Sequence, residues 1–129
     1  MNLSTQKMVE QTIESIVQIT NPYGSGSGFV IDGLIITNSH VVSGLKEVLI
    51  STKSLAKTIG TVVYDDPAFD LAFIRSPVPI KPTHALLLAT SPIQDGDGVI
   101  AIGHPYGLNY STTEGIISKS SRLQGEVEY

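Results

Sequence analysis

Short runs of β-branched and other apolar residues dominate most of this sequence, and residues that favour turns separate them. After Asn21 the runs are GSGFVI, LIITN, EVLIS, TIGTVVY, DLAFI, ALLLA, GVIAIG and EGIISKS. They recur at intervals of about 8 to 15 residues, with no long helical pattern between them. This rhythm predicts an all-β chain, built as an antiparallel barrel or sandwich, rather than a fold in which helices alternate with parallel strands.

A helical pattern precedes these runs. Between Lys7 and Ile19 the apolar residues begin at helical spacing and finish with alternation. They are Met8, Val9, Ile13, Ile16, Val17 and Ile19. We therefore expect a short N-terminal helix that runs into a strand.

The proline-rich segment Ser76–Pro82 is the one obvious linker in the sequence. Proline stiffens the backbone and removes the N–H donors that a β-ladder needs. The linker divides the chain into two expected units. Residues 1–82 would hold the helix and a complete first β-barrel, formed mostly by residues 24–80, and residues 83–129 would form a second unit.

The second unit carries too few strand signals for a closed barrel. Clear signals lie at Ala85–Ala89, Gly98–Gly103 and Thr113–Ser120, and Glu126–Tyr129 indicates the start of a further strand. A small closed barrel needs about twice that number of strands. We therefore expect a partial second barrel with an unpaired edge, which invites self-association.

Composition narrows the classes of partner. The 129 residues are 41% hydrophobic and 16% charged, with a net charge of -4 and no cysteine. These values are typical of a folded globular protein, and the absence of a basic stripe argues against a nucleic-acid partner. Without cysteine there is no disulfide and no cysteine-based metal site or nucleophile. No stretch approaches the ~20 apolar residues of a membrane span, so we expect no membrane insertion, and the cellular compartment stays open.

One histidine and one aspartate stand out as a candidate catalytic pair. His40 follows an apolar strand, and Asp70 opens another apolar run thirty residues later. A carboxylate that leads into a buried strand needs a partner. With His40 as that partner, Asp70 would fix the ring tautomer and stabilise the imidazolium that forms when the ring takes a proton from a nucleophile. The competing interpretations are a structural histidine and a turn aspartate that caps its own backbone.

Four motifs in a fixed order resemble the successive landmarks of HtrA-type serine proteases, which have the two-barrel chymotrypsin-like fold. The motifs are GSGFVI, TNSHVV, DLAFI and IAIGHPYGL, and TEGIIS is similar to the strand that follows in that family. The resemblance covers nearly the whole chain from about Ile16 onward. It implies that His40 is the general base and Asp70 its orienting acid. The family's nucleophile lies in a GNSGG-like segment, which nothing in this sequence matches, so we expect the chain to stop before that segment.

Other candidate sites are weaker. Neither Ser25 nor Ser27 has glycine at both two residues before and two residues after it, as a nucleophile elbow requires. We interpret their Gly-Ser run as a flexible or tightly packed start of a strand. The DGDG sequence at 95–98 lacks the later residues of a calcium loop and predicts a turn. His84 and His104 have no ligand at helical spacing, so we expect neither a metal nor a cofactor. His104 stands where the look-alike sequences more often have Asn, and its bearing on catalysis stays open.

The sequence therefore predicts a serine endopeptidase of the HtrA type that acts on protein or peptide substrates. This chain carries the histidine and the aspartate of a Ser-His-Asp catalytic triad but not its serine nucleophile, so we expect it to be inactive alone. The alternative is a non-catalytic module that kept the barrel and lost the nucleophile, and that serves in binding or regulation. A GNSGG-like segment in the reading frame beyond Tyr129 would support the enzyme, and its absence would support the module.

Overall fold

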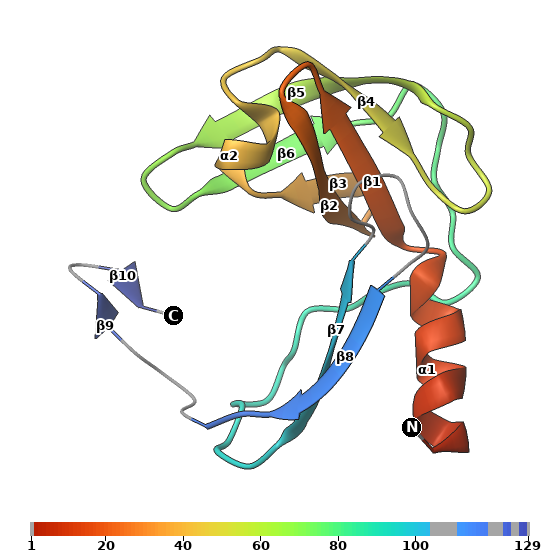
Figure 1. Cartoon of the computed structure of the whole chain (residues 1–129), viewed down its shortest axis with the longest axis vertical. Helices are drawn as coiled ribbons and strands as arrows, with labels where there is room; N and C mark the ends of the chain where they lie inside the picture. Colours follow the sequence, from red (N-terminus) through yellow and green to blue (C-terminus); the bar gives the residue numbers. More distant parts are fainter. Residues whose placement is uncertain (1, 104–110, 119–122, 125–126, 129) are drawn as a thin grey trace.

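A closed β-barrel forms the largest part of the structure, a computed structural model that describes residues 2–103, 111–118, 123–124 and 127–128 (Figure 1). The elements in chain order are α1 (Leu3–Ile13), β1 (Ile16–Asn21), β2 (Gly24–Ile31), β3 (Leu34–Thr37), α2 (Ser39–Val42), β4 (Glu47–Ser51), β5 (Thr58–Asp66), β6 (Leu71–Arg75), β7 (Gly98–Gly103), β8 (Ser111–Ile116), β9 (Leu123–Gln124) and β10 (Val127–Glu128). The first six strands make the barrel.

The barrel strands lie in the order β1-β2-β3-β6-β5-β4, and every neighbouring pair is antiparallel. The ring closes where β4 pairs with β1, with Ile50 opposite Ile19. This confirms the predicted first barrel, although it begins at Ile16 rather than Gly24. The barrel starts earlier because the apolar residues that precede the β1–β2 turn form strand β1, which pairs with both β2 and β4.

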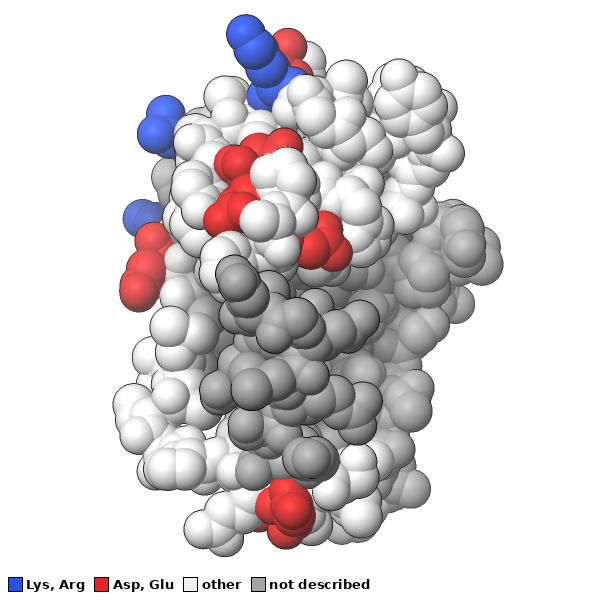
Figure 2. Space-filling view, turned by 90° about the vertical axis from the view of Figure 1, so that its left-hand side faces the viewer, with Lys and Arg blue, Asp and Glu red and all other residues white. Residues whose placement is uncertain are grey.

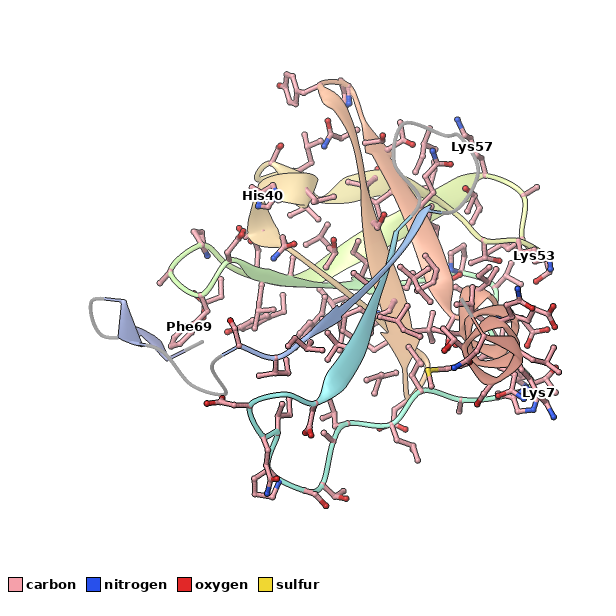
Figure 3. All side chains as sticks on the ribbon, turned by 60° about the horizontal axis from the view of Figure 1, so that its bottom comes forward. Lys7, His40, Lys53, Lys57 and Phe69 are labelled. Carbon is pink, nitrogen blue, oxygen red and sulfur yellow. The ribbon has the colours of Figure 1, made fainter. Side chains whose placement is uncertain are left out.

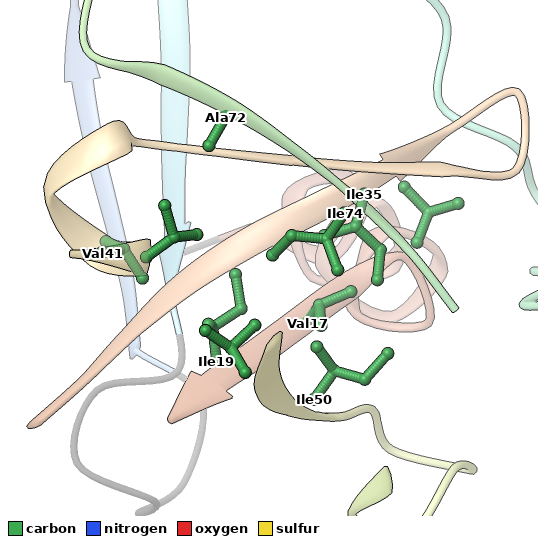
Figure 4. Packing of buried hydrophobic residues seen from close by; sticks show 10 residues of the cluster. Val17, Ile19, Ile35, Val41, Ile50, Ala72 and Ile74 are labelled. Atoms are coloured by element: carbon green, nitrogen blue, oxygen red, sulfur yellow. The ribbon is translucent and has the colours of Figure 1, made fainter. Parts of the chain in front are cut away.

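Branched aliphatic side chains fill the barrel. Ile19, Ile35, Ile50 and Ile74 come from four different strands, and each is fully buried (Figure 4). Burying one such side chain contributes roughly 1.5 to 3 kcal/mol relative to leaving it in water. Because side chains alternate across a strand, a one-residue slip would expose the buried set, so the core fixes the register of each strand.

The β2–β3 hairpin turns through two residues. Asp32 and Gly33 both have positive φ, at 50° and 77°, and the flanking residues Ile31 and Leu34 pair with each other. A turn of this kind matches the right-handed twist of the two strands, which is why Asp-Gly is favoured there. The turn directs β3 back along the barrel to Thr37, where the chain leaves the sheet for α2.

The Gly-Ser run of β2 is tightly packed at two of its three glycines. A Cβ atom on Gly26 would come within 2.7 Å of the Val41 side chain, and one on Gly28 within 2.8 Å of the backbone oxygen of Ile36. A Cβ on Gly24 would meet nothing within 4 Å. The interpretation of a tightly packed strand therefore holds for Gly26 and Gly28. The close approach at Gly26 seats α2 directly on β2.

The predicted helix that runs into a strand is present and begins earlier than expected, at Leu3. The side chain of Asn2 caps it by accepting a hydrogen bond from the backbone N–H of Thr5, at 2.8 Å. Such a cap satisfies one of the free donors of the first turn and explains the earlier start. No helix in the described part of the chain combines the length and the apolar character needed to cross a membrane.

After the barrel, β7 and β8 form a two-stranded sheet, and β9 pairs with β10. The expected strand at Ala85–Ala89 is wrong, because residues 76–97 contain no strand. Leu87 and Leu88 are 86% and 71% exposed, and an apolar run becomes a strand only where a neighbouring strand can pair with it. The other two signals correspond to β7 and, starting two residues early, to β8. The boundary between two units at residue 82 stays a prediction.

Candidate active site

His40 lies on a four-residue helix held by its two valines. Val41 and Val42 are buried, whereas the His40 side chain is 72% exposed. Asn21 adds a tether, since its side-chain amide donates to the carbonyl of Val41 at 2.5 Å. Ser43, which follows the helix as its C-cap, adopts the left-handed conformation. The buried valines and the bond from Asn21 hold α2 on the barrel, and α2 places the exposed imidazole at the barrel's rim.

Asp70 occupies the turn between β5 and β6, and its backbone has a φ of 53°. This left-handed conformation is uncommon for a residue with a side chain and is often found at functional sites. Two contacts hold it. The backbone N–H of Asp70 donates to the carbonyl of Pro67 at 3.3 Å, and the side-chain amide of Asn38 donates to the carbonyl of Asp70 at 3.0 Å.

The structure brings His40 and Asp70 into direct contact. Oδ2 of Asp70 lies 2.8 Å from Nδ1 of His40, and Oδ1 accepts the backbone N–H of His40 at 2.9 Å. One carboxylate therefore holds both the ring and the backbone of the same residue. With the proton on Nδ1, the other ring nitrogen, Nε2, carries the lone pair and can accept a proton. The catalytic roles of the two residues stay a prediction.

The backbone N–H of His40, reinforced by the imidazole, holds the pKa of the Asp70 carboxyl below its ordinary value of about 3.8, against a smaller opposing effect of burial. Hydrogen bonds to a carboxylate favour its charged form. The carboxylate is therefore ionised at neutral pH and can stabilise a positive charge on the ring.

The side chain that caps the β5–β6 turn is Asp66, not Asp70. Oδ1 of Asp66 accepts the backbone N–H groups of Ala68 and Phe69 at 3.1 and 3.3 Å. This leaves the carboxylate of Asp70 available for His40, and it removes the competing interpretation that Asp70 caps its own backbone. The Asp-Pro pair at residues 66–67 was the sequence signal for this cap.

Two further contacts at the site were not expected from the sequence. They are the bond from Asn38 to the carbonyl of Asp70 and a bond from the hydroxyl of Ser39 to Oδ1 of Asp65, at 2.5 Å. Both join α2 to the β5–β6 hairpin. Figure 3 shows the result, with His40 on the same side of the barrel as Phe69 of that hairpin.

A hollow of about 380 Å³ opens beside His40. The β1–β2 turn, the Gly-Ser run and α2 line it. On the side of the molecule from which the β5–β6 turn projects, acidic atoms gather over the barrel, and Lys and Arg lie toward the margin (Figure 2). A more apolar groove of about 340 Å³ lies over β1, β4 and β5 and contains no histidine.

The remaining candidates do not join this site. Residues 95–96 form the predicted turn, where Oδ2 of Asp97 accepts the backbone N–H of Gln94 at 2.9 Å. No group of three potential metal ligands occurs among the residues that the structure describes. His84 lies in the segment between the barrel and β7, and His104 lies outside the described residues.

Comparison with known proteins supports the resemblance seen in the sequence. The serine protease HhoA of Synechocystis, described as putative, is 40% identical over 106 residues, which are 77% of this chain and 26% of that protein. Serine protease HTRA1A of Danio rerio is 38% identical over 100 residues, which are 76% of this chain and 21% of that protein. The chain thus spans about a fifth to a quarter of the length of these relatives.

Solved structures share the fold. The Rv3671c protease of M. tuberculosis, in an inactive form, superposes with a TM-score of 0.83 and 33% identity over 95% of this chain and 61% of the other. The HtrA-type protease AlgW, solved with a tripeptide, has a TM-score of 0.81 and 29% identity over 93% of this chain and 41% of the other. The expected chymotrypsin-like fold is thus confirmed. The trypsin-like peptidase domain matches residues 26–129, so the chain belongs to the trypsin-like peptidase family, with HtrA-type serine proteases among its relatives.

Proposed function

We propose that this chain supplies the general base, His40, and the orienting acid, Asp70, of a serine endopeptidase. The observation that carries the proposal is the double contact of the Asp70 carboxylate with the ring and the backbone N–H of His40, at 2.8 and 2.9 Å. A carboxylate in this position keeps the proton on Nδ1 and turns Nε2 toward the nucleophile. The substrates are proteins or peptides, as the names of the relatives indicate for those proteins.

In the reaction, Nε2 of His40 accepts the proton of a serine hydroxyl as the serine attacks the peptide carbonyl. Asp70 stabilises the resulting imidazolium, which then donates the proton to the leaving amine. Backbone N–H groups near the nucleophile stabilise the oxyanion, and each such donor contributes about 2.7 to 4 kcal/mol in comparable sites. No serine of this sequence lies in a GNSGG-like segment, so the nucleophile and its oxyanion donors have no counterpart here.

The tautomer of His40 tests the proposal directly. We expect the Nδ1–H form to predominate at alkaline pH, and the Nε2–H form to gain in Asp70→Asn. The asparagine has one oxygen, which the backbone N–H of His40 engages, so its NH₂ group faces Nδ1 and favours the wrong tautomer. The measurement is ¹⁵N NMR of labelled histidine, with His40→Gln to assign the signals. Equal tautomer ratios in the wild type and Asp70→Asn would overturn the proposed pairing.

The chain alone should not hydrolyse peptide bonds. The two serine hydroxyls of α2 and its C-cap take part in other hydrogen bonds: Ser39 donates to Asp65, and Ser43 donates to the carbonyl of His40 at 3.0 Å. In a well-studied triad, loss of the nucleophile alone lowers kcat on the order of a millionfold. We therefore expect no turnover of unfolded casein and no labelling by a fluorophosphonate probe.

The control for this experiment is His40→Ala, prepared in the same way. Stoichiometric labelling of one serine that disappears in His40→Ala would show a nucleophile within this chain, with Ser25 and Ser27, which line the hollow beside His40, as the first candidates. Binding of unlabelled peptide without any turnover would agree with the absence of a nucleophile. It would also indicate that the barrel binds peptide.

We also infer self-association through the part of the chain after the barrel. In the described residues β7 and β8 pair only with each other, and apolar side chains such as Leu87, Leu88 and Ile116 are exposed there. Unpaired strand edges and apolar surface favour association with a second copy.

A further inference from the structure

We propose that Ser39 and Asp65 form a positioning pair that orients the His40 ring toward Asp70; the proposal rests on the catalytic role given to His40 and Asp70 above. Ser39 is the first residue of α2, and Asp65 lies on β5. Neither touches the reacting atoms, so both act through the placement of His40.

The contact between Ser39 and Asp65 is partly protected from water. The Ser39 hydroxyl donates to Oδ1 of Asp65 at 2.5 Å, and Ser39 is only 8% exposed. A buried hydroxyl without a partner is costly, so the pair gives α2 one preferred position on β5.

The pair is linked to the catalytic contact through the backbone. The backbone N–H of His40 and, to a smaller extent, that of Ser39 lower the pKa of the Asp70 carboxyl. In the β5–β6 ladder, Asp65 pairs with Ala72, two residues after Asp70. Ser39 is thus held by a side-chain contact to the same hairpin that carries the orienting acid.

The length of α2 explains why such a pair is needed. An isolated helix of four residues is not stable, so the direction of its side chains depends on tertiary contacts. The buried valines fix the depth of α2, and Asn38 fixes its start by donating to the carbonyl of Asp70. The bond between Ser39 and Asp65 adds a contact on the hairpin side and opposes rotation of α2 about its axis. A misplacement of about 1 Å can lower a catalytic rate on the order of a hundredfold.

The test is the His40 tautomer in four variants of the 129-residue chain, read by ¹⁵N NMR. Ser39→Ala and Asp65→Ala should each lower the ratio of the Nδ1–H to the Nε2–H form by roughly two- to tenfold, which corresponds to about 0.4 to 1.4 kcal/mol. Asp65→Asn should keep most of the wild-type ratio, because the amide oxygen still accepts the Ser39 hydroxyl. The double variant Ser39→Ala/Asp65→Ala should lower the ratio by less than the product of the two single effects, because each single variant removes the same bond.

Ser51→Ala is the matched control. Its hydroxyl also donates to a side-chain oxygen of a neighbouring strand, that of Gln18 at 3.2 Å, but between β4 and β1. We expect Ser51→Ala to leave the tautomer ratio unchanged. Unchanged ratios in Ser39→Ala and Asp65→Ala, with only a lower free energy of unfolding, would show a merely structural bond and overturn the pair. An unchanged ratio in Asp70→Asn would instead overturn the catalytic pairing, so the two failures are distinguishable. Asp65 is exposed, so its variants keep the test valid if Ser39→Ala does not fold.

Discussion

At the scale of single residues, the site depends on which carboxylate does which task. Asp66 caps the β5–β6 turn, Asp65 accepts the hydroxyl of Ser39, and Asp70 faces His40. All three lie within six residues of sequence. The left-handed backbone of Asp70 separates its direction from that of its neighbours and aims it at α2.

The lowered pKa of Asp70 makes part of the stability depend on pH. Because the carboxyl binds its proton more weakly in the folded state, its contribution is fully present above the ordinary value of about 3.8 and is lost as the pH falls through the lower folded-state pKa. We expect the free energy of unfolding of the wild type to exceed that of Asp70→Asn at neutral pH, and the difference to shrink at acid pH. Urea unfolding followed at several pH values measures this.

The cause of this shift can be separated by a second variant. In His40→Ala the ring is lost but the backbone N–H stays, so the pKa of the Asp70 carboxyl should rise only part of the way toward its ordinary value. Carboxyl ¹³C NMR reports that pKa directly. A difference in unfolding free energy between the wild type and Asp70→Asn that stays constant down to strongly acid pH would contradict the assigned pKa direction.

At the scale of elements, β2 is where close packing joins the barrel to the site. Its glycines allow α2 and β3 to approach the strand backbone, at Gly26 and Gly28 respectively. Side chains at these positions would displace the elements that carry His40. The Gly-Ser run therefore serves as a strand on which neighbouring elements pack closely, rather than as a reactive loop.

Gly28→Ala should destabilise the chain by about 1 to 3 kcal/mol, the usual cost of added atoms in a tightly packed core. The new Cβ would lie 2.8 Å from a backbone oxygen, so a strand rather than a side chain has to move. Gly24→Ala is the matched control in the same run, because its Cβ meets nothing within 4 Å, and we expect a change of no more than about 0.5 kcal/mol. Chemical denaturation measures both. Equal effects of the two variants would contradict this account.

At the scale of the whole molecule, the barrel is closed and the segments after it are not. Every strand from β1 to β6 has two neighbours, whereas β7 and β8 have one each in the described residues. The barrel therefore has no unpaired edge strand. The unpaired edges and exposed leucines lie together in the part of the chain beyond residue 82.

We expect the weight-average mass of the chain in sedimentation equilibrium to rise with concentration. The variant Leu87→Ser/Leu88→Ser should lower this association, because it removes exposed apolar surface outside the barrel. Leu3→Ser is a suitable control, since Leu3 is 79% exposed but lies on α1. A monodisperse monomer at all concentrations, with full amide protection in β7, would contradict the inference.

Local patterns in the sequence predicted the barrel strands, the short helix and the residues His40 and Asp70, which the structure brings into contact. Alternation and turn residues act between near neighbours, so the runs that became β1 to β6 were visible without the fold. The motifs around His40 and Asp70 were visible for the same reason, and their order indicated the family.

Only the tertiary structure decided which residues meet. The bonds from Asn38 to Asp70 and from Ser39 to Asp65 join segments 26 to 32 residues apart, and no local pattern reports such contacts. The run at Ala85–Ala89 has the composition of a strand but finds no partner to pair with. Composition is a property of one segment, whereas a hydrogen-bonded ladder or a contact between two side chains is a property of two, and that is the physical reason why the fold had to supply them.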